Sequence, residues 1–389
     1  MPKRNAHGAG SIRQRHGGRW EARYTSGRDP GTGKQVQKSV YGATQEEVVK
    51  KLRQVLTELD GGVFVEPSKM TVGAWLDIWV KEYLGAAKPS TQENYASYTK
   101  NHIKPSLGAV KLQKLKPHQI QAFYNSLMIG EDALTAKTVR NIHGILHKAL
   151  KQAVKVGYIN NNPSEMCELP RVVKKDMKVL DTDAVGAFLA AIEGHQFEAI
   201  YFVDLFTGLR QSEILGLTWD VVDFTAGTIF VSKQLVKGTK ARGMYYLDSL
   251  KNDKPRKIKP ASIVMQKLRE QKNRQTEWRL KAGPAWDNPL NLVFTDELGK
   301  HLVHNTVYKH YKKVVAGIGE PDLRFHDLRH SYAVVALMNG DDIKTVQGNL
   351  GHHTAAFTLD QYGHVTEQMQ EASANRMDAF IKGLGKKKA

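Results

Sequence analysis

The pattern of apolar and polar positions near the start of the chain predicts a small β-sheet. Apolar and polar residues alternate in three short runs, at residues 11–15, 19–25 and 35–41, which is typical of strands that have one buried face. The first two runs are joined by Gly17-Gly18, and a glycine pair accepts the positive φ angles of a tight hairpin turn. We therefore expect a three-stranded sheet in this region.

One helix is expected to follow the sheet. The residues Thr44-Gln45-Glu46-Glu47 have the order of a capping box, which opens helices, and Gly61-Gly62 can end one. Apolar residues recur between these signals at helical spacing: Val48, Leu52, Val55, Leu56 and Leu59. Residues 1–64 are thus predicted to form a sheet-plus-helix module, which is small for a hydrophobic core of its own.

The next hundred residues show helical periodicity. Apolar residues at positions 72, 75, 76 and 79 have the spacing of one helix, and its two tryptophans, Trp75 and Trp79, are interpreted as core residues. Further helices are expected from their start and stop signals: one from Pro89 that ends before Pro105, one after Pro117, and one from Thr135 or Thr138 to Gly157. We predict a helical domain over residues 69–168.

A linker and a third domain complete the predicted organisation. Residues 169–178 are rich in lysine and arginine and are interpreted as a basic linker. Asp181 or Thr182 then caps a new helix, and residues 179–385 form the predicted last domain. Its final segment, from Thr366 to Lys382, places apolar residues at helical spacing, with Phe380 among them. This helix can pack on its own domain or on a second copy of the chain, and the sequence leaves both open.

Composition and charge narrow the function. Of 389 residues, 41% are hydrophobic and 25% are charged, which is a globular composition, and the formal net charge is +18. Such an excess predicts a polyanionic partner, either nucleic acid or an anionic membrane surface. Apolar stretches are too short for a membrane span, no secretory signal is recognisable, and the single cysteine, Cys167, excludes an internal disulfide. We therefore expect a cytosolic nucleic-acid-binding protein.

The positive charge is concentrated at the start of the chain. Residues 1–41 contain nine lysines and arginines but only two acids. If the strands alternate as predicted, Arg13, Arg15, Arg19 and Arg23 project from one sheet face and contact DNA; the alternative is a solvated basic edge strand. Further basic residues on the helical domain and the linker are expected to bind DNA: Lys137, Arg140, Lys174 and Lys175.

Four polar segments of the last domain contain candidate chemistry. They are Thr207–Leu217 with Arg210 and Glu213, the hairpin-like stretch Leu250–Ile258 with Lys251, His326-Asp327-Leu328-Arg329-His330, and Leu350-Gly351-His352 followed ten residues later by Tyr362. His326 and His330 have the spacing of two zinc ligands. However, the glutamate of that motif is absent and Arg329 would repel a cation, so a metal site is disfavoured.

Together these residues suit the transfer of a phosphoryl group. An arginine fork binds phosphate oxygens in a bidentate manner, and two forks with histidine donors can neutralise the charge that develops on phosphorus. A tyrosine hydroxyl can act as a covalent nucleophile, and a lysine on a hairpin can protonate a leaving alkoxide. A carboxylate cluster of the two-metal type does not accompany them, which predicts chemistry without metal.

In this order and at these separations, the motifs resemble those of the tyrosine recombinase (phage integrase) family, most of all integrases of Gram-positive conjugative transposons and temperate phages. The resemblance covers nearly the whole chain. It implies Tyr362 as the nucleophile, five further catalytic residues (Arg210, Lys251, His326, Arg329 and His352), and three supporting residues (Glu213, Asp327 and His330). Lys251 begins a Lys-x-x-x-x-Arg-x-x-x-Pro stretch; Lys240, Lys254 and Lys257 remain alternatives for the lysine, and His353 adjoins His352.

The resemblance also implies a fold and a function. The expected fold class is multidomain and mainly α with small β-sheets (α+β): an arm-site-binding sheet module, a helical core-binding domain, and a mixed α/β catalytic domain with a three-stranded sheet near residues 218–260 and a C-terminal exchange helix. The two larger domains would clamp duplex DNA. The expected function is site-specific recombination that integrates and excises a mobile element through a 3′-phosphotyrosyl intermediate and a Holliday junction.

The expected partners are double-stranded DNA at core and arm attachment sites, three further protomers in a homotetramer, and an excisionase or a host DNA-bending protein. No cofactor, metal or membrane partner is expected, and the expected location is the bacterial cytoplasm, with the nucleoid. Two alternatives are a type IB topoisomerase-like enzyme and a DNA-binding regulator that keeps the fold without catalysis. The small basic arm module argues against the first, and the full set of six polar positions argues against the second.

Overall fold

The structure is a computed structural model, and it describes residues 11–29, 31–61, 68–173, 178–238, 245–250, 254–351, 354, 374–378 and 380–382. The chain divides into two compact units, Met1–Lys174 and Lys175–Ala389. The finer division at residues 64, 69, 168 and 178 stays a prediction. Among the described residues, no helix is both long and apolar enough to cross a membrane.

The first unit begins with the predicted sheet and helix. Strands β1 (Ser11–Gln14), β2 (Trp20–Arg28) and β3 (Gln35–Gly42) form an antiparallel sheet in that order. Gly17 and Gly18 have φ angles of 97° and 80° in the turn between β1 and β2, as the hairpin requires. Helix α1 (Gln45–Asp60) begins where the Thr44 hydroxyl accepts a hydrogen bond from the Glu47 amide. These predictions are confirmed.

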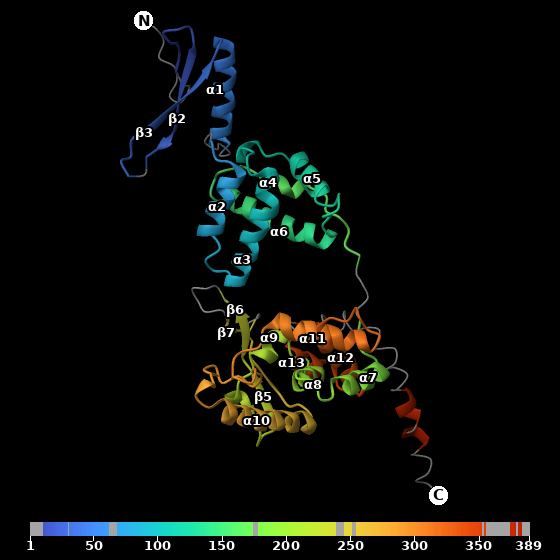
Figure 1. Ribbon diagram of the computed structural model, residues 1–389. Coiled ribbons are helices and arrows are strands. Elements are labelled where there is room, and N and C mark those ends of the chain that lie inside the picture. The colour runs from blue at the N-terminus through green and yellow to red at the C-terminus, as the bar shows by residue number, and fades with distance from the viewer. Residues whose placement is uncertain are drawn as a thin grey trace. The chain divides into compact units, whose positions relative to one another are not determined.

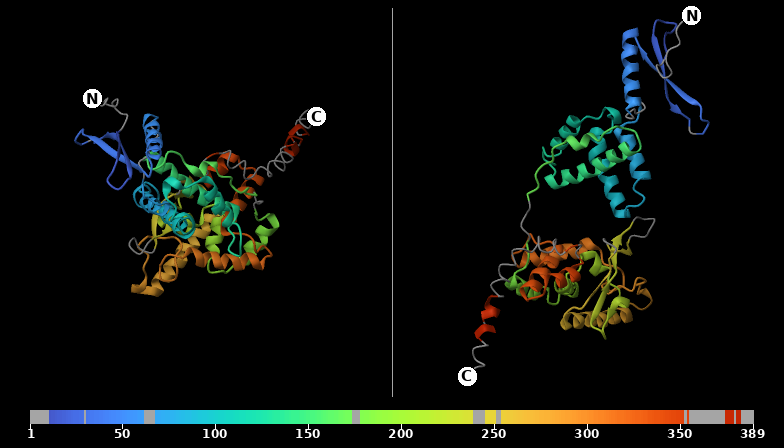
Figure 2. Two further views of the ribbon diagram at one scale, coloured as in Figure 1. Left: turned by 90° about the horizontal axis from the view of Figure 1, so that it is seen from above. Right: turned by 180° about the vertical axis from the view of Figure 1, so that it is seen from behind.

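Helix α1 lies against one face of this sheet (Figure 1 and Figure 2). The small core between them contains Ala22 and Tyr24 from β2 and Val48 and Leu52 from α1. Because neighbouring strand residues point to opposite faces, the residues that alternate with Ala22 and Tyr24 lie on the face away from α1. Glu21 and Arg23 are two of them.

From position 68 onwards, the described part of the first unit is mainly helical. It contains α2 (Val72–Glu82), α3 (Pro89–Tyr98), α4 (Lys104–Leu107), α5 (Pro117–Ser126) and α6 (Ala136–Lys155), with short 3₁₀ turns at Leu112–Lys114 and Pro163–Met166. Trp75 and Trp79 are buried in its core, as predicted. The Trp75 indole also donates a 2.8 Å hydrogen bond to the Ala149 carbonyl, which joins α2 to α6.

The chain remains helical beyond the point at which the sequence predicted a stop. Helix α3 does end before Pro105, but a π-helical turn (Thr99–Ile103) leads directly into α4, with Pro105 in its first turn. A proline is tolerated there because the amide of a first-turn residue has no partner within its helix. The predicted end of this helix before Pro105 is therefore confirmed, and the structure adds a π-helical turn and α4, which continue the helical path.

The second unit combines helices with two small antiparallel sheets. Its helices are α7 (Thr182–Ile192), α8 (Glu198–Thr207), α9 (Gln211–Leu215), α10 (Ser262–Ala282), α11 (His304–Gly317), α12 (Phe325–Met338) and α13 (Ile343–Leu350), with short 3₁₀ turns at Trp219–Val221 and Gly283–Ala285. Strands β4 (Val222–Asp223), β5 (Thr228–Val231) and β8 (Arg256–Ile258) form one sheet, and β6 (Lys233–Lys237) and β7 (Tyr245–Ser249) form the other.

This unit confirms the predicted fold class and refines it. A three-stranded sheet was expected near residues 218–260, and the described residues contain it, together with a separate β6–β7 hairpin. The core of the unit includes the packed aromatic rings of Phe188, Tyr201, Tyr311 and Phe325. It brings α7, α8, α11 and α12 together (Figure 1).

The described part of the C-terminal segment is helical and exposed. Residues 374–378 and 380–382 have helical conformation. The side chains of Met377, Phe380 and Ile381 are 58%, 62% and 58% exposed. These three apolar residues therefore lie outside the buried core of the described residues.

Candidate active site and DNA-contact residues

Arg210 is held at the start of a short helix by a buried carboxylate. Helix α8 ends at Gly208, which has a left-handed φ of 61°, and a Cβ at this position would lie 2.5 Å from the Tyr332 ring. Two residues later, the Arg210 amide and Nη1 donate to the two Glu213 carboxylate oxygens at 3.0 and 2.6 Å. Glycine thus allows the turn, and Glu213 fixes the arginine that follows it.

A second arginine, which the sequence did not single out, completes this network. Arg256 on β8 donates to both Glu213 oxygens, with a shortest distance of 2.6 Å, and its Nε donates to the Asn349 carbonyl at 2.7 Å. Burial raises the pKa of Glu213, but the hydrogen bonds and charges of Arg256 and Arg210 outweigh it and hold this pKa at about 2. Glu213 is therefore a buried anion between two arginines.

Helix α12 carries four of the predicted residues. Asp327 caps its first turn, because its carboxylate accepts from the Arg324 amide at 2.7 Å and from the Arg324 guanidinium at 2.7 Å. The His326 and His330 rings lie one turn apart, with centroids 5.0 Å from each other. Among the residues that the structure describes, no three His, Cys, Asp or Glu side chains are grouped so that they could hold a metal ion.

Arg329 on the same helix is almost fully buried. Its Nη1 donates to the Gly208 carbonyl at 2.7 Å and its Nη2 to the Leu350 carbonyl at 2.5 Å. Both carbonyls lie at the carboxyl ends of helices, α8 and α13, where backbone acceptors have no partner within the helix. Arg329 therefore ties together the segment that precedes Arg210 and the segment that precedes His352.

The two histidines are neutral near pH 7. Loss of hydration is the largest cause that lowers the pKa of His326 to about 4; the nearby His330 ring and the positive charges of Arg329 and Arg210 lower it further. Burial likewise dominates at His330 and lowers its pKa to about 4. A neutral imidazole can still donate one hydrogen bond to a phosphate oxygen.

A fully buried acid lies behind this group. Asp204 on α8 has no exposed surface, and neither of its carboxylate oxygens has a hydrogen-bond partner among the described residues. Burial raises its pKa well above the ordinary value, although the charge of Arg329 opposes this. The sequence offered no signal for Asp204, because an acid within an apolar helix is visible only as an irregularity in the pattern.

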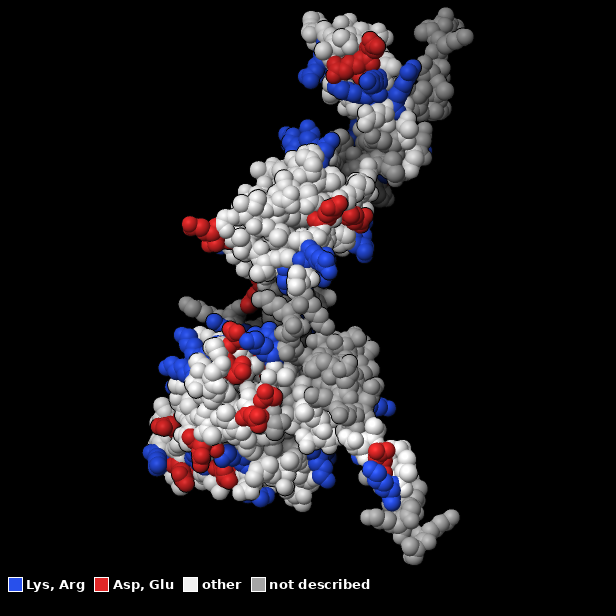
Figure 3. Space-filling view, turned by 90° about the vertical axis from the view of Figure 1, so that its right-hand side faces the viewer, with Lys and Arg blue, Asp and Glu red and all other residues white. Residues whose placement is uncertain are grey.

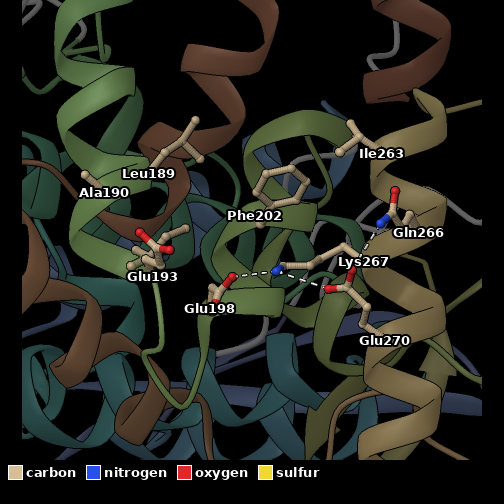
Figure 4. A pocket seen from close by; sticks show the side chains of 10 residues that line it. Leu189, Ala190, Glu193, Glu198, Phe202, Ile263, Gln266, Lys267 and Glu270 are labelled. Atoms are coloured by element: carbon tan, nitrogen blue, oxygen red, sulfur yellow. Dashed lines mark hydrogen bonds and ion pairs between the residues drawn. The ribbon is translucent and has the colours of Figure 1, made fainter.

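A separate pocket lies between α7, α8 and α10 (Figure 4). In this pocket, Lys267 on α10 pairs with Glu198 on α8 and with Glu270 one turn further along α10. None of the residues that line this pocket is a predicted site residue.

Several predicted residues fall outside the described part of the chain. They are Lys251, His352, Tyr362, Lys174 and Lys175, together with the alternatives Lys240 and His353. Lys254 and Lys257 are described, and both are exposed. The structure thus brings together Arg210, Glu213, His326, Asp327, Arg329 and His330 in one unit; their roles in catalysis stay predictions.

The predicted DNA-contact residues of the first unit have distinct surroundings. Arg13, Arg15 and Arg23 surround Glu21 on the sheet face away from α1, and the Arg19 guanidinium lies 5.5 Å from the centre of the Tyr41 ring. On α6, Lys137 is exposed, and Arg140 donates to the Pro170 carbonyl at 2.9 Å. On the face that Figure 3 shows, basic and acidic side chains are interspersed on both units.

Comparisons with known proteins identify the family of the chain. Residues 178–369 match the model of the phage integrase family, and residues 71–128 match the model of the phage integrase N-terminal SAM-like domain. A tyrosine recombinase XerC-like protein of Caldanaerobacter subterraneus subsp. tengcongensis is 30% identical over 376 residues, which cover 92% of this chain and 95% of that protein.

Two solved structures show the same fold. The integrase of transposon Tn1549 in complex with transposon right end DNA has a TM-score of 0.68 and 23% identity, over 79% of this chain and 100% of that one. A lambda integrase tetramer bound to a Holliday junction has a TM-score of 0.57 and 19% identity, over 90% and 95%. From its sequence, its fold and these likenesses, the chain belongs to the phage integrase family of tyrosine recombinases.

Proposed function

We propose that this protein is a site-specific DNA recombinase that integrates and excises a mobile element. One observation carries the proposal: Arg329 is hydrogen-bonded to the Gly208 carbonyl, two residues before Arg210. This hydrogen bond fixes α12 against the turn that leads to Arg210, so the two arginines lie in one connected part of the unit, as residues that act on a single phosphate would have to. The Tn1549 integrase, a protein of similar fold, has been solved with transposon DNA.

The proposed chemistry follows from the groups available. Arg210, Arg329, His326 and His352 donate hydrogen bonds to the non-bridging oxygens of the scissile phosphate. The Tyr362 hydroxyl attacks phosphorus and gives its proton to water, the bond to the 5′-oxygen breaks, and a 3′-phosphotyrosine and a free 5′-hydroxyl result. Lys251 supplies the proton for the departing oxygen.

Rejoining reverses these steps on a different strand. A 5′-hydroxyl from the partner duplex attacks the phosphotyrosine, and the tyrosine leaves and recovers its proton. Because the phosphotyrosyl bond conserves the energy of the phosphodiester, neither ATP nor another cofactor enters the reaction. Two rounds of exchange pass through a Holliday junction.

The proposed assembly is a homotetramer on two duplexes. A lambda integrase tetramer has been solved on a Holliday junction, and the exposed Met377, Phe380 and Ile381 suit a C-terminal helix that packs on a neighbouring protomer. The helical and catalytic domains would hold core DNA, with phosphate contacts from Lys137, Arg140, Lys174 and Lys175, and residues 1–64 would hold arm DNA. An excisionase or a DNA-bending protein would set the direction, and the bacterial cytoplasm is the proposed compartment.

A covalent-trapping experiment tests the proposed reaction. The full-length chain is incubated with a supercoiled plasmid that carries the end of the element, in the presence of a metal chelator and without ATP, and the products are denatured. The proposal expects protein covalently attached to DNA. An adduct that forms only when a divalent metal is added would contradict it.

A further inference from the structure

A buried carboxylate lies at the centre of the sheet face that faces away from α1. In the strand register, Glu21 on β2 is directly opposite Arg13 on β1 and Tyr41 on β3. The side chain of Glu21 is only 1% exposed, although no helix packs on this face in the described part of the sheet. The groups that cover Glu21 are therefore its own neighbours on the sheet.

Three arginines and two hydroxyls converge on this carboxylate. Glu21 Oε2 accepts from Arg13 Nε at 2.7 Å and from Arg15 Nε at 2.8 Å, and Oε1 lies 3.5 Å from Arg23 Nε. Oε1 also accepts from the hydroxyls of Ser39 at 2.7 Å and Tyr41 at 3.3 Å. The hydrogen bonds of Arg15, Ser39 and Arg13 hold the pKa of Glu21 far below its ordinary range.

The arginines remain accessible while they are held. The side chains of Arg13, Arg15 and Arg23 are 49%, 49% and 42% exposed. Each of them has its Nε towards Glu21, and Arg15 also donates from Nη2 to Oε1 at 3.2 Å. An arginine reads a guanine through two parallel hydrogen bonds, which requires a fixed guanidinium plane. A side chain that is fixed before binding also loses less conformational entropy when it binds.

A role in charge alone does not account for this arrangement. If these arginines served only to neutralise phosphates, a carboxylate among them would weaken binding, because it removes one positive charge from the face. The other acid of this sheet region, Asp29, lies in the loop after β2, where its carboxylate accepts from the amides of Gly31 and Thr32. Glu21 is thus the acid that organises the arginine face.

We propose that Glu21 is a positioning residue of the DNA-contact face, and that it gives this face its preference for particular base sequences. It holds Arg13, Arg15 and Arg23 over the sheet face. The nitrogens of each guanidinium that point away from Glu21 then donate hydrogen bonds to base edges in the major groove. The inference rests on the proposed function, namely that residues 1–64 bind arm DNA.

The test compares Glu21→Gln with Glu46→Gln in the full-length chain. Both variants remove one negative charge from the same module, but Glu46 is exposed on α1. Binding is measured to short duplexes that tile both ends of the element and to shuffled duplexes of the same composition. The preference is the ratio of the affinity for the most tightly bound duplex to the affinity for its shuffled version. For Glu21→Gln we expect this ratio to fall at least about fivefold, while shuffled DNA is bound equally well or more tightly. Glu46→Gln should keep the preference.

A second variant distinguishes a loss of sequence preference from a loss of folding. Arg13→Lys keeps the charge but loses the fork that Glu21 holds, so it should lower the same preference while the melting temperature stays unchanged. If Glu21→Gln tightens binding to tiles and shuffled duplexes equally, or if Arg13→Lys leaves the preference intact, the proposal is overturned. Covalent attachment at the crossover site, measured in the same samples, reports separately on the proposed recombinase activity.

Discussion

Nη1 of Arg329 donates a 2.7 Å hydrogen bond to the carbonyl oxygen of Gly208. Gly208 ends α8 in a left-handed conformation and stands two residues before Arg210, so this bond links the two arginines that the sequence nominated as a pair. Since the other Nη of Arg329 donates to the Leu350 carbonyl, one side chain connects three of the four segments that carry candidate chemistry.

The first prediction concerns Arg210. Its side chain is 25% exposed, and Glu213 keeps Arg256 as a partner when Arg210 is removed, so the fold should tolerate Arg210→Ala. We expect cleavage to slow by about 2.7–4 kcal/mol in activation free energy, the loss typical of one oxyanion donor. DNA affinity should change little, because many other basic residues contact the backbone.

Single-turnover cleavage and a binding titration separate these two effects. The matched control is Arg279→Ala, which removes an exposed arginine from α10 and should cleave normally. Arg329→Ala should lose cleavage as well, but it should also melt at a lower temperature because two buried carbonyls lose their donor. Near-normal cleavage by Arg210→Ala would count against its assignment.

The second prediction concerns the buried carboxylate of Glu213. Glu213→Gln leaves the neighbouring buried Arg256 without its ionic partner, and breaking a buried pair in this way costs about 3–5 kcal/mol of unfolding free energy. The folded-state pKa of Glu213 is about 2. The ionised carboxylate therefore contributes fully to the free energy of unfolding at pH values above the ordinary pKa range of glutamate, and this contribution is lost as the pH falls towards 2.

Urea unfolding at several pH values measures this contribution. In a double-mutant cycle, Arg256→Met should be destabilising alone but much less so in the Glu213→Gln background. Additive effects of the two changes would show that the pair contributes no coupling energy.

The third prediction concerns the histidines of α12. The pKa values of His326 and His330 are about 4 in the folded chain, below the ordinary value for histidine, so the unfolded chain takes up protons first as the pH falls. Stability should be constant above about pH 6.5 and should decline as the pH falls from there towards 4. Melting temperatures of His330→Gln should decline less over that window; an equal decline would contradict the assignment.

The fourth prediction concerns the lysine that protonates the leaving oxygen. A bridging 5′-phosphorothiolate leaves without protonation, so this substrate should restore cleavage by Lys251→Ala and should do little for Arg210→Ala. Lys254→Ala and Lys257→Ala are the matched controls, since both residues are exposed nearby. If the phosphorothiolate restores cleavage by Lys254→Ala or Lys257→Ala and not by Lys251→Ala, the rescued lysine is the proton donor and the assignment of Lys251 is wrong.

The sequence predicted most elements of the fold because their signals are local. The Gly17-Gly18 hairpin, the Thr44 cap and the buried Trp75 and Trp79 all follow from periodicity and turn chemistry. The helical path through Pro105 could not be foreseen, because the neighbouring π-helical turn depends on packing. The separate β6–β7 hairpin likewise depends on which strands pair, and spacing alone does not decide that.

The candidate site was predictable only in part, for a similar reason. Motif order identified Arg210, Glu213, His326 and Arg329, but the partners that hold them come from distant segments. Arg256 stands in the Lys-x-x-x-x-Arg stretch that begins at Lys251, yet nothing in that spacing shows that its side chain turns inward to Glu213. In the same way, strand alternation placed the arginines on one sheet face without showing that Glu21 would be buried beneath them.

The central claim is that Tyr362 is the nucleophile of a DNA recombinase. The most direct measurement compares wild type with Tyr362→Phe on a plasmid that carries the element's end, scoring both DNA binding and protein that stays attached after denaturation. The variant loses only a hydroxyl, so the account predicts unchanged binding and no covalent adduct. An adduct of normal yield with Tyr362→Phe would contradict the account, and Tyr332 would be the next residue to test.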